Sequence, residues 1–103
     1  MRATIERALA SIIGFLVRRV VDHKLVPDAG QLKKIQSAKI GTTFNINGAM
    51  YTVRDVQVEL DGTRILYFKN FALVLHHGYV HFVRIKRRRN GELWKAVKIH
   101  SLK

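Results

Sequence analysis

The residues best suited to chemistry in this sequence are cations near its carboxyl-terminal end. Between residues 84 and 103 stand eight lysines and arginines, against the single acid Glu92. Arginine binds phosphate through two parallel hydrogen bonds, and tryptophan offers a face on which a base can stack. The sequence therefore predicts an anion-binding hairpin, whose binding residues are Arg84, Lys86, Arg87, Arg88, Arg89, Trp94, Lys95 and Lys98.

An Asn90-Gly91 turn would join the two strands of this hairpin. Asn-Gly is favoured in two-residue hairpin loops because both positions need positive φ. In that register Lys86 lies opposite Lys95, and such a like-charge pair destabilises a sheet by a few tenths to about 1 kcal/mol. A phosphate between the two side chains would remove this cost, which favours anion binding over a hairpin tip that is merely solvated.

The histidines are a second candidate for chemistry: they are His23, His76, His77, His81 and His100. The same register places His81 opposite His100, where two imidazoles near a lysine would suit acid–base cleavage of RNA. Two or three histidines can also bind a metal ion. No carboxylate stands at a diagnostic spacing beside them, so we predict no catalytic residues, no metal and no cofactor.

Composition limits the remaining function classes. The absence of cysteine excludes disulfides and thiolate zinc sites and favours a reducing, cytoplasmic location. The 19 lysines and arginines exceed the 7 acids, which gives a formal net charge of +12 on 103 residues. Repulsion among so many positive charges opposes folding, so we expect an anionic partner that offsets this cost. Phosphate-binding glycine loops, nucleophile elbows and zinc-protease motifs are absent from the sequence.

A long helix is predicted over residues 4–24. The apolar residues that recur there at three- and four-residue spacing are Ile5, Leu9, Ile12, Leu16 and Val20. The apolar run at residues 8–17 is shorter than the roughly 20 residues that span a membrane. We therefore expect no membrane contact, and a helix that packs on a sheet or on a second copy in a homo-oligomer. Pro27 predicts a break or a fresh helix start, and residues 31–37 are expected to form a short second helix.

After Gly41 the pattern becomes alternating, and turn signals follow at Asn47-Gly48, Asp61-Gly62, Asn70, His77-Gly78 and Asn90-Gly91. The predicted strands are residues 39–46, 49–60, 63–69, 71–76, 79–89 and 92–102. A bulge near Arg54 and Asp55 would reconcile the two alternations within residues 49–60.

These elements predict an α+β fold in a single domain, residues 1–103. Its helical segment covers residues 1–38, and its antiparallel meander of five to six strands covers residues 39–103. We expect the long amino-terminal helix to pack on a meander that is strongly bent or closed into a small SH3-like or Sm-like barrel, because closure removes exposed edges. An open sheet with the helix across one face is the alternative.

The function expected from the sequence is that of a small basic, non-enzymatic protein that binds the phosphate backbone of RNA or DNA. Base specificity is not predicted, because phosphate contacts do not read sequence. One alternative is an inhibitor or adaptor that docks its basic face on an acidic protein. Another is a small basic ribonuclease or toxin that uses His81 and His100.

Overall fold

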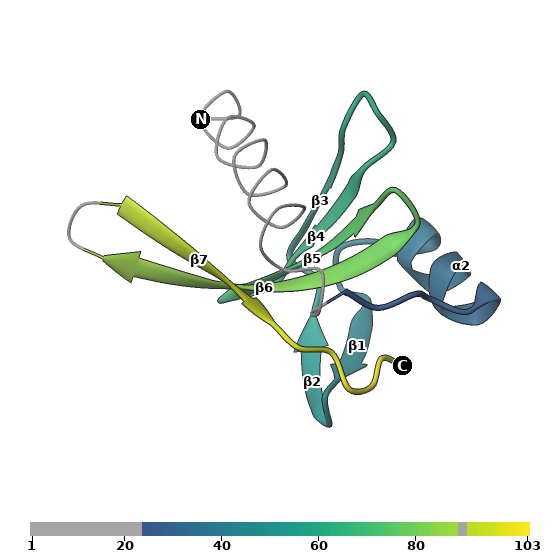
Figure 1. The fold of residues 1–103 in the computed structure, drawn as a ribbon, viewed down its shortest axis with the longest axis horizontal. Coiled ribbons are helices and arrows are strands. Elements are labelled where there is room, and N and C mark those ends of the chain that lie inside the picture. The colour runs from purple at the N-terminus through teal and green to yellow at the C-terminus, as the bar shows by residue number, and fades with distance from the viewer. Residues whose placement is uncertain (1–23, 89–90) are drawn as a thin grey trace.

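The computed structural model describes residues 24–88 and 91–103, with the backbone alone for residues 85–88 and 91–94. This part of the chain forms one α-helix and antiparallel β-strands (Figure 1). Their bounds are α2 Ala29–Ser37, β1 Thr43–Ile46, β2 Ala49–Thr52, β3 Asp55–Val58, β4 Arg64–Tyr67, β5 Phe71–His76, β6 Tyr79–Arg88 and β7 Gly91–Val97. Strands β1 and β2 form one sheet, and the other sheet has the order β3-β4-β5-β6-β7.

Helix α2 is the short helix that the sequence predicts, extended by two residues at its start. Asp28 caps it: the Asp28 carboxylate accepts a hydrogen bond from the Gln31 backbone N–H at 2.8 Å, and the Gln31 side chain accepts one from the Asp28 N–H at 2.9 Å. This reciprocal pair satisfies two backbone donors that a helix start leaves free. The long helix predicted over residues 4–24 falls outside the described residues, except for Lys24, which lies in no helix.

The bulge predicted near Arg54 is instead the point where the chain passes between the two sheets. Val53 exchanges backbone hydrogen bonds with Thr42 and Gly41, on the side of β1, at 2.8 Å each. The next residue, Arg54, donates its N–H to the Tyr67 carbonyl of β4 at 2.7 Å. The single strand predicted over residues 49–60 is therefore two strands with different partners.

The predicted closed barrel is wrong for the described residues. The five-stranded sheet ends at β3 on one side and at β7 on the other, and β1 and β2 pair in a separate sheet. A tail of residues 101–103 runs beside β1, where Asn45 and Lys103 exchange two backbone hydrogen bonds at 2.9 Å. An isolated bridge between Ile46 and Leu102 completes this contact, which is too short to close a barrel.

The larger sheet is apolar on both faces. One face packs in a core with Ile35 of α2 and with Phe44 and Ile46 of β1; its own residues there are Leu66, Leu73, Leu75, Val80 and Phe82. The phenyl rings of Phe71 and Phe82 stack within this core, with centroids 4.7 Å apart. The alternate residues Ile65, Ala72, Val74 and Val83 are also buried. Because strand side chains alternate between faces, β4, β5 and β6 are buried on both sides.

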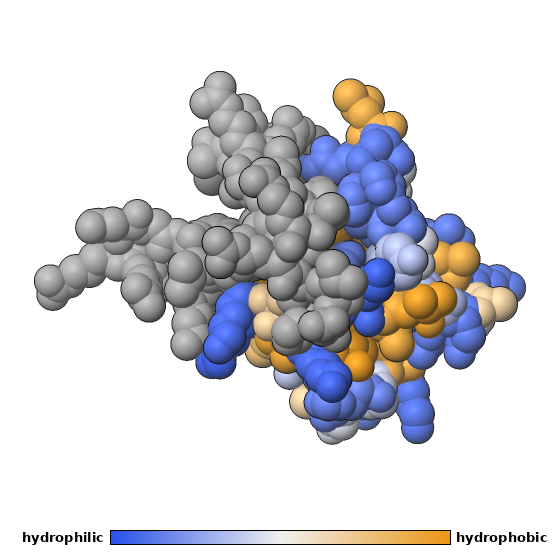
Figure 2. All heavy atoms as spheres, viewed as in Figure 1, coloured by the Kyte–Doolittle hydropathy of each residue, from blue (hydrophilic) through white to orange (hydrophobic). Residues whose placement is uncertain are grey.

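Some large apolar side chains remain exposed. Leu60 and Val58 lie toward the outer end of the β3–β4 hairpin, where Figure 2 shows apolar atoms at the tip. Isolated exposed apolar residues are common on protein surfaces, so we assign these no role. Within the described residues no helix has the length and apolar character needed to cross a membrane.

One side chain of β4 holds α2 against the sheet. The Arg64 guanidinium donates to the carbonyl of Ile35 at 2.9 Å and to that of Ala38 at 3.0 Å. These carbonyls lie at the end of α2, beyond the reach of the regular helical N–H donors, although Ile35 also accepts a longer hydrogen bond from the Ala38 N–H at 3.3 Å. Arg64 is thus a structural cation and not a candidate for ligand binding.

Replacing Arg64 with alanine should destabilise the fold by about 2 kcal/mol or more, because two charge-assisted hydrogen bonds to the end of α2 are lost. Arg64→Lys should recover only part of this, since an ammonium group lacks the planar fork of the guanidinium. Urea unfolding measures both changes. The control is Arg54→Ala, which removes an exposed arginine; equal loss in Arg54→Ala and Arg64→Ala would contradict the assignment.

Candidate functional site

The basic hairpin of β6 and β7 extends beyond the sheet. Arg84 is the last residue of β6 that pairs with β5, where it lies opposite Phe71. The remaining residues of β6 pair with β7 alone, down to Arg88 opposite Gly91. Residues 85–88 and 91–94 therefore form a two-stranded ribbon that projects from the body of the molecule (Figure 1). We call this segment the ribbon.

The predicted register of this hairpin is wrong by two residues. Arg84, not Lys86, lies opposite Lys95, and Lys86 lies opposite Leu93. The shift has a packing reason: Val83 is buried, and the observed register pairs it with Ala96, whereas the predicted one pairs it with the exposed Lys98. A shift by two residues keeps every side chain on its face, so the two registers differ in their cross-strand partners: the small Ala96, not the long cationic Lys98, lies opposite the buried Val83.

The shift leaves a like-charge pair at the base of the ribbon. Arg84 and Lys95 are cross-strand neighbours, and both side chains are exposed. Like charges directly opposite one another destabilise a strand pair, by a few tenths to about 1 kcal/mol. The local cost that the sequence predicted is therefore present, carried by Arg84 in place of Lys86.

For most of the other predicted binding residues the structure describes the backbone but not the side chain. Lys86, Arg87 and Arg88 lie on the β6 strand of the ribbon and Trp94 on its β7 strand, opposite Ile85. The side chains of these four residues and the whole of Arg89 lie outside the described part of the structure. Lys98 follows the end of β7 and is exposed. Its carbonyl accepts a hydrogen bond from the Asn47 amide at 2.7 Å, which holds this segment beside β1.

Carboxylates do not neutralise the described cations. Asp28 caps α2, Asp55 accepts from the Val56 N–H, Glu59 accepts from the Gln57 amide, and Asp61 accepts from the Thr63 N–H. Among the described side chains the only ion pair joins Asp61 to a histidine. Two lysines make cation–π contacts instead, Lys24 over Tyr79 at 4.2 Å and Lys34 over Phe44 at 4.5 Å.

The histidine pair proposed for RNA cleavage does not form. His81 lies opposite Val74 within the sheet and is buried, whereas His100 lies beyond the end of β7 and is exposed. The His100 backbone N–H donates to the Asn47 side chain at 2.6 Å. The ribonuclease alternative therefore loses the cross-strand geometry on which it depended.

His81 is unusual in another respect. Its Nδ1 is buried and has no hydrogen-bond partner among the described residues. Burial, with smaller contributions from the charges of His76 and Lys24, lowers the pKa of His81 from 6.5 to about 4. The ring is therefore neutral at physiological pH and behaves as a core side chain.

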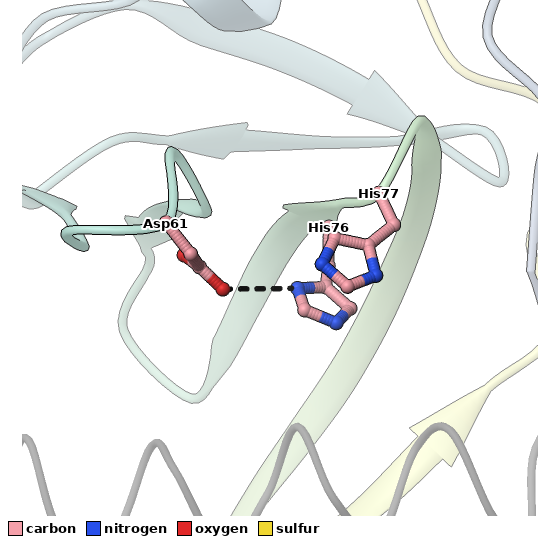
Figure 3. A group of neighbouring side chains, drawn as sticks. All are labelled: Asp61, His76 and His77. Carbon is pink, nitrogen blue, oxygen red and sulfur yellow. Dashed lines mark ion pairs between the residues drawn. The ribbon is translucent and has the colours of Figure 1, made fainter.

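A second cluster joins two turns and was not predicted from the sequence. Asp61, His76 and His77 offer ligand atoms that all lie within 4.8 Å of one another. His76 Nδ1 shares a hydrogen bond with the buried Thr63 hydroxyl at 2.7 Å and lies 3.9 Å from the Asp61 carboxylate. The His76 and His77 rings stack with centroids 3.8 Å apart (Figure 3).

The protonation states of this cluster follow from its contacts. Hydrogen bonds from Thr63, its backbone N–H first, lower the pKa of Asp61. Burial lowers the pKa of His76, and the nearby His77 lowers it further, while Asp61 acts in the opposite direction. Near neutral pH the cluster therefore contains an ionised carboxylate beside an uncharged His76 ring.

Comparison with protein-family models, with curated proteins and with solved structures gave no significant match.

The low pKa of His81 predicts a specific acid sensitivity. As pH falls below 6.5 the unfolded chain protonates His81, whereas the folded protein resists until about pH 4. The unfolded state then binds more protons, so stability falls with pH across this range. The full difference corresponds to at most about 3 kcal/mol. Urea unfolding at pH 7.5 and pH 4.5 should show a smaller acid loss in His81→Leu than in the unsubstituted protein.

His100→Leu is the matched control, because it removes an exposed histidine. It should retain the acid loss of the unsubstituted protein. Identical pH dependence in His81→Leu and the unsubstituted protein would show that His81 does not cause the loss.

Proposed function

We propose that the protein is a non-enzymatic nucleic-acid-binding module that contacts phosphate groups through the ribbon and its base. The observation that carries the proposal is the Arg84–Lys95 pair, two exposed cations held opposite one another where the ribbon leaves the sheet. An anion between them would replace a repulsion with two attractions. Charged groups at this site reduce the stability of the hairpin unless a partner offsets them.

The shape of the ribbon supports the same proposal. A two-stranded ribbon that projects from a body can enter the major groove of B-DNA, which is wide enough for such an element. The cations of β6, together with Lys95 of β7 at the ribbon base, would then lie near the phosphates that border the groove. In RNA the ribbon would instead meet single-stranded loops, where Trp94 would provide a stacking surface.

The charge distribution of the described residues adds a further argument. Their acids are engaged in local hydrogen bonds, so exposed lysines and arginines lack carboxylate partners within the described part of the molecule. Each cation that binds a phosphate releases condensed counterions, which makes affinity depend steeply on salt.

Salt-dependent binding tests this function. Fluorescence anisotropy with duplex DNA, single-stranded DNA and an RNA hairpin should reveal binding at low salt. If about six phosphates are contacted, the slope of log affinity against log salt on duplex DNA is near −5. Arg84→Gln with Lys95→Gln should make this slope shallower by about 2, because each lost phosphate contact removes about one.

A control pair with Lys33→Gln and Lys39→Gln removes two exposed cations from α2 and the residues after it. This pair should leave the slope nearly unchanged. Absence of binding to every nucleic acid at low salt would overturn the proposal. Equal effects of the two double variants would overturn the assignment to the ribbon base. Co-purification of a stoichiometric acidic protein after nuclease treatment would favour docking on protein instead.

A further inference from the structure

The meander brings two distant turns together at one end of the sheet. Successive hairpin turns alternate between the two ends, so the β3–β4 and β5–β6 turns lie at the same end. Strand pairing fixes this arrangement, because Arg64 at the start of β4 lies opposite Leu75 near the end of β5. Asp61 in the first turn thus lies beside His76 and His77 at the second (Figure 3).

The backbone of the second turn puts both imidazole rings on one side. His77 and Gly78 have φ of 48° and 81°, as a two-residue hairpin turn requires. Adjacent residues of a regular strand would point to opposite faces. The left-handed conformation of His77 instead leaves its ring stacked on that of His76.

We propose that Asp61, His76 and His77 bind a divalent transition-metal ion of the zinc class. The three side chains supply two imidazole nitrogens and one carboxylate oxygen, a donor set that suits Zn²⁺, Co²⁺ and Ni²⁺ and does not suit Mg²⁺ or Ca²⁺. Three protein ligands leave a fourth position of a tetrahedral ion open to water or another ligand.

Binding of one ion requires the ligand atoms to approach one another and the His77 ring to rotate out of its stack on His76, because an imidazole nitrogen donates in the plane of its ring. Zinc bonds of about 2.0 to 2.2 Å place tetrahedral ligand atoms roughly 3.4 Å apart. A separation at the present limit of 4.8 Å must therefore shorten by about 1.4 Å. Asp61 and His77 are exposed turn side chains with room to rotate, whereas His76 is buried and fixed by Thr63. One anchored and two adjustable ligands can close on an ion.

A structural role for the same residues explains part of the cluster. The Asp61–Thr63–His76 contacts already tie the two turns together. His77, however, is exposed, and its described contact is the stacked ring of His76. Rotation of this ring out of the stack would bring its nitrogen to an ion that Asp61 and His76 also bind.

This site is independent of the proposed nucleic-acid function. The ribbon projects from the end of the sheet that carries the β4–β5 turn, whereas the cluster lies at the end that carries the β3–β4 and β5–β6 turns. A failure to bind metal would leave the proposed nucleic-acid function unchanged. A failure to bind nucleic acid would likewise leave the proposed metal site unchanged.

Calorimetric titration of untagged, chelator-treated protein with Zn²⁺ tests the proposal, and the visible absorption of added Co²⁺ reports its coordination. We expect binding of about one ion per chain. His77→Asn should weaken it at least about tenfold, because even changes to outer-shell partners of a metal cost 10- to 100-fold. Asparagine tolerates the left-handed conformation, so this variant keeps the turn.

Two further variants complete the design. Asp61→Asn retains an oxygen that can accept from the Thr63 N–H but loses the charged ligand, and it should also weaken binding at least about tenfold. His100→Asn removes an exposed histidine that is not in the cluster and should bind as the unsubstituted protein does. Absence of Zn²⁺ binding, or undiminished binding in both cluster variants, would overturn the proposal.

Discussion

The left-handed turn at His77-Gly78 is the constraint from which the arrangement of both candidate sites follows. It fixes the register of β5 and β6, from His76 opposite Tyr79 to Phe71 opposite Arg84. Strand β6 is longer than β5, so its last four residues pass beyond the sheet and pair with β7 alone. The same turn sets the His76 and His77 rings side by side. One local backbone conformation thus determines the ribbon at one end and the histidine pair at the other.

The two ends of the larger sheet differ in whether their charged side chains have partners. At the turn end, the Asp61 carboxylate, the Thr63 hydroxyl and His76 interact within a compact polar group. At the ribbon base, Arg84 and Lys95 lie opposite one another, and no carboxylate of the described residues pairs with either. Polar groups that bind one another contribute to the fold, whereas cations left without partners are available to a ligand. The middle of the sheet, buried on both faces, separates these two regions.

The sequence predicts the positions of helices and strands well, and the register of strands and the long-range arrangement poorly. Alternation and turn residues locate β5 at its observed bounds and α2 within two residues, because both depend on near neighbours. The change of sheet at Arg54 is read only as a bulge, since its cause is the distant Tyr67 carbonyl. The predicted β6–β7 register is wrong by two residues, since the Asn-Gly turn preference does not take account of which residue packs opposite the buried Val83. The Asp61–His76 contact joins two turns that are distant in the sequence. Alternate hairpin turns of a meander lie at the same end of the sheet, so the order of the turns in the sequence already indicates this proximity.

The pairing of β1 with the tail has a consequence for the order of folding. Asn45 bonds to Lys103, and the Asn47 side chain accepts from the backbone of His100 and Ser101. Contacts between residues so far apart along the chain carry a loop-closure cost and form slowly. The meander can assemble from successive hairpins, each closed by a local turn, but β1 gains its second neighbour only after the tail has emerged from the ribosome. The contact between β1 and residues 101–103 should therefore be the last part of the described structure to form.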